Sequence, residues 1–230
     1  MRRKKQDVEE EDSEDWLATY ADAITLLMAF FVMLVSFSKV DIPMFEQVQA
    51  GIKEYVGGQD DPTKTPIFEL QSILSTSIEE EDSLPPESVD VGFDDVGVVI
   101  NFGSGSFFED GSANLSDPAK LILKKIKREL QETPYDLFMV DIEGHTDSDP
   151  IADTSIYPSN WELSAARAAS VVRYLISQGM DAYRMKASGY ADTKPKVPEK
   201  DVMGNSLPEN KAQNRRVSIR LFPGFANEAF

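Results

Sequence analysis

The chain has 230 residues, which is room for one domain of ordinary size together with an anchor and linkers. Its net charge of −17 argues against a nucleic-acid partner, because a general nucleic-acid binder presents a basic face. There is no cysteine and only one histidine, so a disulfide framework, a thiolate metal site and a His-rich metal site are all excluded.

The N-terminal part of the sequence predicts a membrane anchor. Residues 18–37 are almost wholly uncharged, and a helix of about twenty such residues crosses the hydrocarbon core. The stretch is longer than the apolar part of a signal peptide, contains an acid and lacks a following Ala-x-Ala site. The basic residues at 2–5 favour a cytoplasmic N-terminus. We therefore expect a cytoplasmic tail over 1–15 and a transmembrane helix over 16–40.

One carboxylate, Asp22, interrupts this apolar stretch. A charge inside the bilayer costs on the order of 2.5–3.5 kcal/mol on insertion scales, so intramembrane acids usually have a function, here the carriage of a cation. The alternative is a chance polar residue near the membrane edge. Small and polar residues share the helical face of Asp22, as expected for contact with a partner helix. They are Ala18, Thr25, Ala29 and Ser36.

Residues 41–56 have an amphipathic helical pattern, with apolar residues at steps of three or four. The apolar positions are Ile42, Phe45, Val48, Ile52 and Tyr55. Such a segment can lie on the bilayer or dock on a partner, and a plain juxtamembrane linker explains the pattern about as well. Residues 57–90 are rich in proline and acids and predict a linker, with a short helix through residues 67–78 that packs against the C-terminal domain.

The remainder, residues 91–230, predicts a compact α+β domain. The helix that begins near residue 115 has Ser116 as its cap and Pro118 in its first turn. Expected strands are Val96–Phe102, Leu137–Glu143, Met185–Ser188 and Val217–Phe222, and expected helices are Leu115–Leu130 and Trp161–Ser177. The long polar loops 147–160 and 191–214 are where binding residues tend to lie.

Four short motifs occur in order in this domain. They are Gly-His-Thr-Asp at 144–147, Asn-Trp-Glu-Leu-Ser-Ala-Ala-Arg-Ala at 160–168, Gly-Tyr at 189–190 and Asn-Arg-Arg-Val at 214–217. This set resembles the OmpA-like peptidoglycan-binding domain over residues 91–223. The run Trp-Leu-Ala-Thr-Tyr-Ala-Asp-Ala-Ile-Thr-Leu-Leu at 16–27 is similar to the B subunit of flagellar stators, the MotB/PomB family.

The resemblance implies a single transmembrane helix followed by a βαβαββ periplasmic domain, in a non-enzymatic protein of the bacterial inner membrane without catalytic residues, metal or cofactor. In that family the membrane acid, here Asp22, binds the translocated H⁺ or Na⁺. Two B chains sit within a ring of MotA/PomA-like A subunits, five A to two B. The segment after the span, here residues 41–56, is a plug that closes the channel until the stator is assembled.

The resemblance also implies a wall-binding site, in which an acid and an arginine hold the diaminopimelate end of a peptidoglycan stem peptide. The matching positions are Asp147 and Arg167. The chemistry is suitable, because a zwitterionic terminus needs one anion for its ammonium and a guanidinium that can grip its carboxylate at two points. Thr146, Asn160 and Leu163 are expected to support the site, and Arg215 to be either a ligand contact or a structural residue. His145 is expected to orient its loop rather than to bind a metal.

The sequence thus predicts an ion-conducting, wall-anchored stator subunit that couples H⁺ or Na⁺ flow to torque in the flagellar motor. Two alternatives stay open. One is a passive envelope tether, for which Asp22 is dispensable. The other is a stator-like subunit of an ion-driven motor outside the flagellum. Thr25, one turn from Asp22, offers its hydroxyl to sodium or to its own helix backbone.

Overall fold

The computed structural model describes residues 15–37, 66–79, 85, 88–109, 111–152 and 155–224. The chain divides into two compact units, Met1–Val40 and Asp41–Phe230. The expected plug, with Ile42, Phe45, Val48 and Ile52, lies outside the described residues, as does most of the N-terminal tail.

The first unit contains helix α1 (Asp15–Phe37). Within the described part of the chain, this is the one helix with a run long and apolar enough to cross a membrane, Trp16–Ser36. Its 23 residues correspond to about 34 Å of helix, a little more than the hydrocarbon core. The side chains of residues 16–36 are exposed in the isolated chain, as a membrane or partner helix would require.

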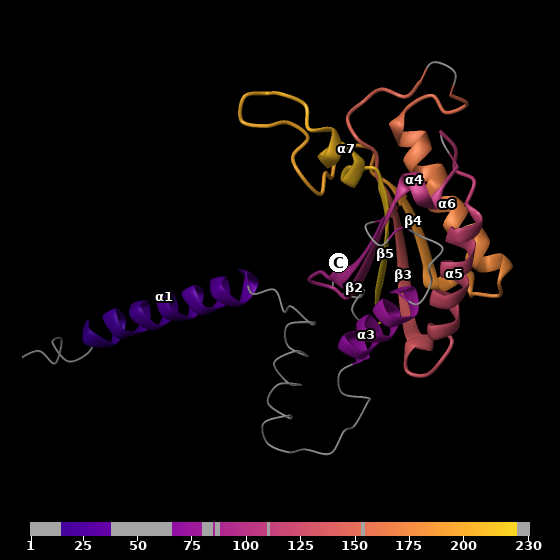
Figure 1. Ribbon diagram of the computed structural model, residues 1–230. Coiled ribbons are helices and arrows are strands. Elements are labelled where there is room, and N and C mark those ends of the chain that lie inside the picture. The colour runs from indigo at the N-terminus through magenta and orange to yellow at the C-terminus, as the bar shows by residue number, and fades with distance from the viewer. Residues whose placement is uncertain are drawn as a thin grey trace, which may run out of the picture. The chain divides into compact units, whose positions relative to one another are not determined.

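The second unit is built on a five-stranded sheet in the order β1-β2-β5-β3-β4 (Figure 1). The strands are β1 (Val89–Phe93), β2 (Val98–Gly103), β3 (Phe138–Gly144), β4 (Met185–Gly189) and β5 (Arg216–Pro223). Only the β3–β4 pair is parallel; the other neighbours are antiparallel. The parallel pair is connected through a helix, as a parallel connection requires.

The helices of this unit are α3 (Pro66–Glu79), α4 (Ser104–Phe107), α5 (Asp117–Glu129), α6 (Asn160–Ser177) and α7 (Pro208–Asn214), with 3₁₀ turns at Tyr135–Leu137 and Ala182–Arg184. Helix α5 begins as the sequence predicts, because the Ser116 hydroxyl accepts from the Ala119 amide and Pro118 lies in the first turn. The mixed α+β architecture confirms the predicted fold class, with β1, α4 and α7 added to the expected elements.

The core lies between one face of the sheet and the helices. Strands β2, β3 and β5 alternate, so that Ile100, Ile142 and Ile219 are fully buried while their neighbours face the other side. Helix α3 contributes Ile67, Leu70, Leu74 and Ile78 to the same core. The helix expected in the linker is therefore present and packed, although Ile73 is 37% exposed and points outward. The packed unit begins before residue 91, because α3 and β1 bury apolar side chains in it.

The strand register determines which ends of the strands meet. Gly144 at the end of β3 is paired with Gly189 at the end of β4 and with Val217 near the start of β5. The loops that follow β3 and β4 and the segment that precedes β5 therefore lie at one end of the sheet. In Figure 1 this end is the upper one, with α7, and α3 lies at the opposite end.

Candidate functional site

Two glycines allow helix α6 to lie directly against the strand ends. A Cβ on Gly144 would lie 2.0 Å from the carbonyl oxygen of Ser164, and one on Gly189 would lie 2.6 Å from the amide nitrogen of Ala165. The buried Ser164 hydroxyl accepts a hydrogen bond from the Ala191 amide and donates one to the Trp161 carbonyl. This close packing places Arg167, one turn further along α6, near the loop that follows β3.

Asp147 is buried in that loop and has two partners for its carboxylate. Oδ2 lies 2.5 Å from Nη1 of Arg215, and Oδ1 accepts from the Asp149 amide at 3.3 Å. The side chain of Asp147 is 9% exposed and that of Arg215 is 47% exposed. Arg215 therefore covers the acid from the solvent side.

Arg167 is also buried, but it is held by a different part of the chain. Its Nε donates to the carbonyl of Ser112 at 3.0 Å, and its guanidinium lies over the ring of Phe108, 5.1 Å from the centroid. Burial lowers the pKa of Arg167, while the nearby Tyr157 and Asp147 raise it and Arg215 lowers it. Among the described residues, hydrogen bonds use only the Nε of this side chain, so its two terminal nitrogens remain available to a carboxylate.

The other expected residues support the loop. The hydroxyl of Thr146 donates to the Asp147 carbonyl, and the Asn160 amide donates to the carbonyls of Asp147 and Asp149. Leu163 is buried and serves packing. The structure thus brings Asp147 and Arg215 into contact and keeps Arg167 close by, held by Ser112 and Phe108.

A second layer of residues joins this loop to the segment before β5. Glu199 accepts from both the amide and the hydroxyl of Ser148, and it also accepts from the fully buried Asn214. Asn214 further accepts from the Lys196 and Val197 amides. Sequence reasoning missed Glu199, Phe108 and Ser112. Asn214 stood inside one of the quoted motifs, and that signal could have found it.

His145 is buried beneath the loop, with its ring stacked on Tyr190. Nε2 lies 3.4 Å from Oε2 of Glu143, which is itself paired with Arg220 at 2.9 Å. Burial lowers the pKa of His145, and the nearby Glu143 carboxylate opposes this only in part. The His145 amide donates to the Arg216 carbonyl, which fixes the loop to β5. The described residues contain no group of three or more metal-ligating side chains.

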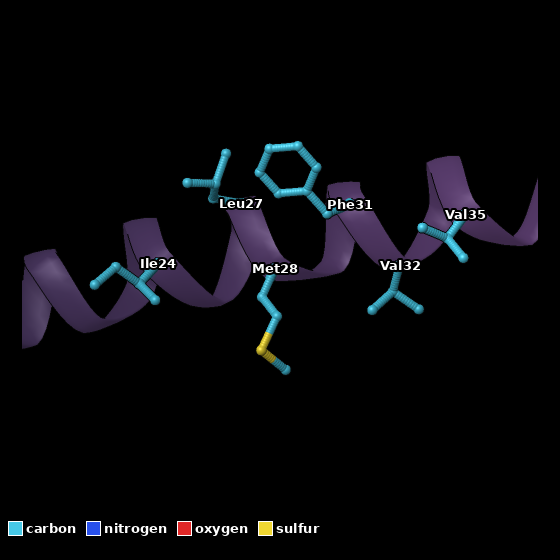
Figure 2. A pocket seen from close by; sticks show the side chains of 6 residues that line it. All are labelled: Ile24, Leu27, Met28, Phe31, Val32 and Val35. Atoms are coloured by element: carbon cyan, nitrogen blue, oxygen red, sulfur yellow. The ribbon is translucent and has the colours of Figure 1, made fainter. Parts of the chain in front are cut away.

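Helix α1 carries two distinct faces. The side chains of Ile24, Leu27, Met28, Phe31, Val32 and Val35 line a shallow hollow along one face. Figure 2 shows that these side chains consist of carbon and one sulfur, without polar atoms. At 100° per residue, Asp22 lies roughly 150° from the middle of that face. Ala18, Thr25, Ala29 and Ser36 lie within the exposed stripe on the side of Asp22. The Thr25 hydroxyl donates to the backbone carbonyl of Asp22 at 2.8 Å. Of the two partners proposed for this hydroxyl, a sodium ion and its own helix backbone, the structure shows the backbone.

Comparison with known families matches both parts of the chain. Residues 1–55 match the model described as membrane MotB of the proton-channel complex MotA/MotB, and residues 107–215 match the OmpA family. The chain is 34% identical to the uncharacterized protein YtxE of Bacillus subtilis, over 95% of this chain and 92% of that protein. It is 27% identical to motility protein B of the same organism, over 99% and 97% of the two chains.

Among solved structures, the cell wall anchor of the T6SS from Pseudomonas aeruginosa is similar to this chain. The two share 31% identity, and the likeness covers 67% of this chain and 96% of that one with a TM-score of 0.54.

Proposed function

The chain belongs to the MotB family, and from that premise we propose that it is the membrane-anchored B subunit of an ion-driven stator that holds itself to peptidoglycan. It couples the flow of H⁺ or Na⁺ through Asp22 to torque in the flagellar motor. The family is structural and non-enzymatic, and the match extends over the membrane segment as well as the OmpA-like domain.

One observation carries the proposal. The same chain has a lone carboxylate on the small-residue stripe of a membrane-length helix and a charged cluster at one end of a separate domain. A torque generator needs both parts, because the ion site must respond to the membrane potential while the subunit stays fixed to something rigid. A cation that moves down the potential releases about 2.3 kcal/mol per charge for each 100 mV.

The wall-binding role rests on the cluster of Asp147, Arg167 and Arg215. Asp147 supplies the anion for the ammonium of a diaminopimelate terminus, and the free terminal nitrogens of Arg167 supply the fork for its carboxylate. Arg215 pairs with Asp147 in the free chain and moves to the ligand carboxylate when the ammonium arrives. In Figure 1 the loops that carry the cluster lie at the end of the sheet away from α3.

The ion path requires partners. Asp22 and its stripe face a multi-span MotA/PomA-like subunit, in an assembly of five A chains around two B chains. The N-terminus is cytoplasmic and the OmpA-like domain is on the outer side of the inner membrane. Residues 41–56 close the path before assembly. These features are drawn from the family resemblance and from the charge pattern of the N-terminus.

Motility in a strain that lacks the native gene tests the proposal. Asp22→Asn is expected to accumulate and insert normally and to abolish swimming, whereas Asp22→Glu retains part of it. Swimming speed with and without sodium, and with a proton uncoupler, identifies the ion. Full motility of the Asp22→Asn strain would overturn the proposed ion-carrying role.

A passive tether is the second candidate, and the similarity to a cell wall anchor of another system favours it. It predicts that Asp22→Asn has no effect on growth or motility and that no multi-span protein copurifies with the chain. A stator-like role outside the flagellum is a third candidate. The Asp22→Asn strain distinguishes it from the flagellar role, because this strain would then lose ion flux and still swim normally.

A further inference from the structure

A polar hollow lies beside the proposed wall-binding cluster, between α5, α6 and the segment that carries Glu109 and Ala113–Leu115. Its volume is about 370 Å³. It is lined by Glu109, Ala113, Asn114, Leu115, Lys120, Ser170 and Arg173. None of these side chains has a part in the cluster of Asp147, Arg167 and Arg215.

Arg173 is the cation of the hollow that lacks an acidic partner among the described residues. Its one hydrogen bond goes from Nη2 to the Ser170 hydroxyl at 2.7 Å. Lys120, by contrast, is paired with Asp117 at 2.8 Å, and the carboxylate of Glu109 accepts from the Asn114 amide at 3.0 Å. An exposed guanidinium held by a single hydroxyl keeps four of its five donors free, and these donors fit a carboxylate.

The hollow and the cluster are joined through the same segment of chain. Phe108 and the Ser112 carbonyl hold Arg167, while Glu109 and Asn114 of the same turn line the hollow. The turn is closed by hydrogen bonds from the Glu109 amide to the Asn114 carbonyl and from the Ser112 amide to the Glu109 carbonyl. Arg167 and Arg173 lie six residues apart on α6, about 120° from one another around the helix axis, so that Arg167 is buried against the turn and Arg173 is exposed.

We propose that this hollow is a second binding subsite for the wall peptide, in which Arg173 holds the free carboxylate of the residue that precedes the clamped diaminopimelate. Glu109 and Asn114 face the same space and offer an acceptor and an amide to the peptide backbone. The proposal rests on the proposed wall binding and adds to it a preference for a peptide over a free amino acid.

Two probes of different length test the subsite on the full chain in detergent. Free diaminopimelate fills only the cluster, whereas a purified disaccharide-tripeptide that ends in diaminopimelate reaches the hollow. Arg173→Gln is expected to weaken binding of the muropeptide about tenfold, the loss expected for one charge-assisted hydrogen-bonded contact, and to leave diaminopimelate affinity unchanged. The matched control is Lys124→Gln on α5, an exposed cation outside the hollow, which changes neither affinity.

The outcomes separate this subsite from the proposed function. Equal muropeptide affinity of wild type and Arg173→Gln would overturn the subsite while wall binding stands. The same conclusion would hold if Arg173→Gln weakened both probes equally. A wild-type chain that binds neither probe would overturn wall binding itself. A muropeptide in which the carboxylate of the residue before diaminopimelate is amidated should bind wild type and Arg173→Gln alike, and a tenfold difference between the two would overturn the role given to that carboxylate.

Discussion

Arg215 lies over Asp147, with 2.5 Å between Nη1 and Oδ2, although the two residues are 68 positions apart in the chain. The pair is unequal, because the acid is buried and the arginine is half exposed. The charge of Asp147 is therefore already compensated in the free chain. A ligand ammonium has to take the place of a guanidinium rather than meet a bare carboxylate.

Because the two side chains differ in burial, we expect single substitutions of Arg215 and Asp147 to lower the free energy of unfolding by different amounts. Arg215→Gln leaves a buried carboxylate without its cation and should lower the free energy of unfolding by about 1–3 kcal/mol. Asp147→Asn leaves a half-exposed arginine that water can solvate, and should cost less than about 1 kcal/mol. Urea unfolding of the full chain in detergent measures both. Equal costs for the two variants would contradict the asymmetric burial of the pair.

Asp147 also sets the expected loss of wall binding. Asp147→Asn removes the anion for the ligand ammonium and should weaken binding to purified peptidoglycan at least about tenfold, as expected for a lost charged partner. The nearby Asp149→Asn is the matched control, because Asp149 is exposed and paired with Lys211 at 2.5 Å. Cosedimentation with sacculi gives the affinities. Equal binding by the two variants would remove Asp147 from the site.

The close approach of α6 to the sheet predicts a strong effect of a single methyl group. Gly144→Ala places a Cβ 2.0 Å from the Ser164 carbonyl oxygen, so α6 must move away from β3. We expect a loss of about 2–4 kcal/mol in unfolding free energy, together with weaker wall binding, because Arg167 is carried on α6. Gly92→Ala in β1 meets no atom within 4 Å and is the control. Similar melting temperatures for the two variants would show that the contact relaxes freely.

Arg184 has a structural role that a stability measurement can detect. Its buried guanidinium donates to the carbonyls of Phe138, Leu130 and Tyr135 at 2.8–3.1 Å. Arg184→Met keeps much of the apolar stem but removes these three hydrogen bonds, so the free energy of unfolding should fall by about 3 kcal/mol or more. Arg128→Met, at an exposed arginine, should change it by less than about 0.5 kcal/mol. Wall binding measured below the unfolding transition should be unaffected in both.

The buried pair of His145 and Glu143 predicts a pH dependence of stability. Burial lowers the pKa of His145 from its ordinary value of 6.5, with Arg216 and Lys194 adding to the effect and Glu143 opposing it. Below pH 6.5 the unfolded chain therefore takes up a proton that the folded chain does not, and stability falls as the pH drops.

Glu143 acts in a lower pH range. Burial raises the pKa of Glu143, but the nearby His145 and Arg220 outweigh this effect, so that the pKa is lowered from 4.5. The contribution of Glu143 to the stability of the folded state is complete above pH 4.5. It is lost as the pH falls through the pKa that Glu143 has in the folded state. His145→Gln should flatten the pH dependence of the melting temperature between pH 6.5 and 5. Because His145 also lowers the pKa of Glu143, the loss below pH 4.5 should become smaller, but it should persist through Arg220. An unchanged slope above pH 5 would mean that His145 is not the group responsible.

The site could be predicted only in part. Asp147, Arg167 and their supports belong to short motifs, so the sequence alone predicts them as candidates. The site also includes Glu199, Ser112 and Phe108. Their contacts are with residues at least 51 positions away in the chain, and no local sequence pattern predicts such contacts. The strand β1 was likewise missed, because its pairing with β2 rather than its own alternation makes it a strand.

Several helices of this protein have a local cause that can be found in the sequence alone. An apolar run of membrane length makes α1, a serine cap and an early proline start α5, and a periodic apolar face makes α3. The contacts between residues far apart in the chain have no such local cause. The register of β5 beside β3 carries Arg215 to Asp147, and two glycines let α6 approach close enough to bring Arg167 beside them. Such contacts depend on strand order and packing distance, which are properties of the folded chain as a whole.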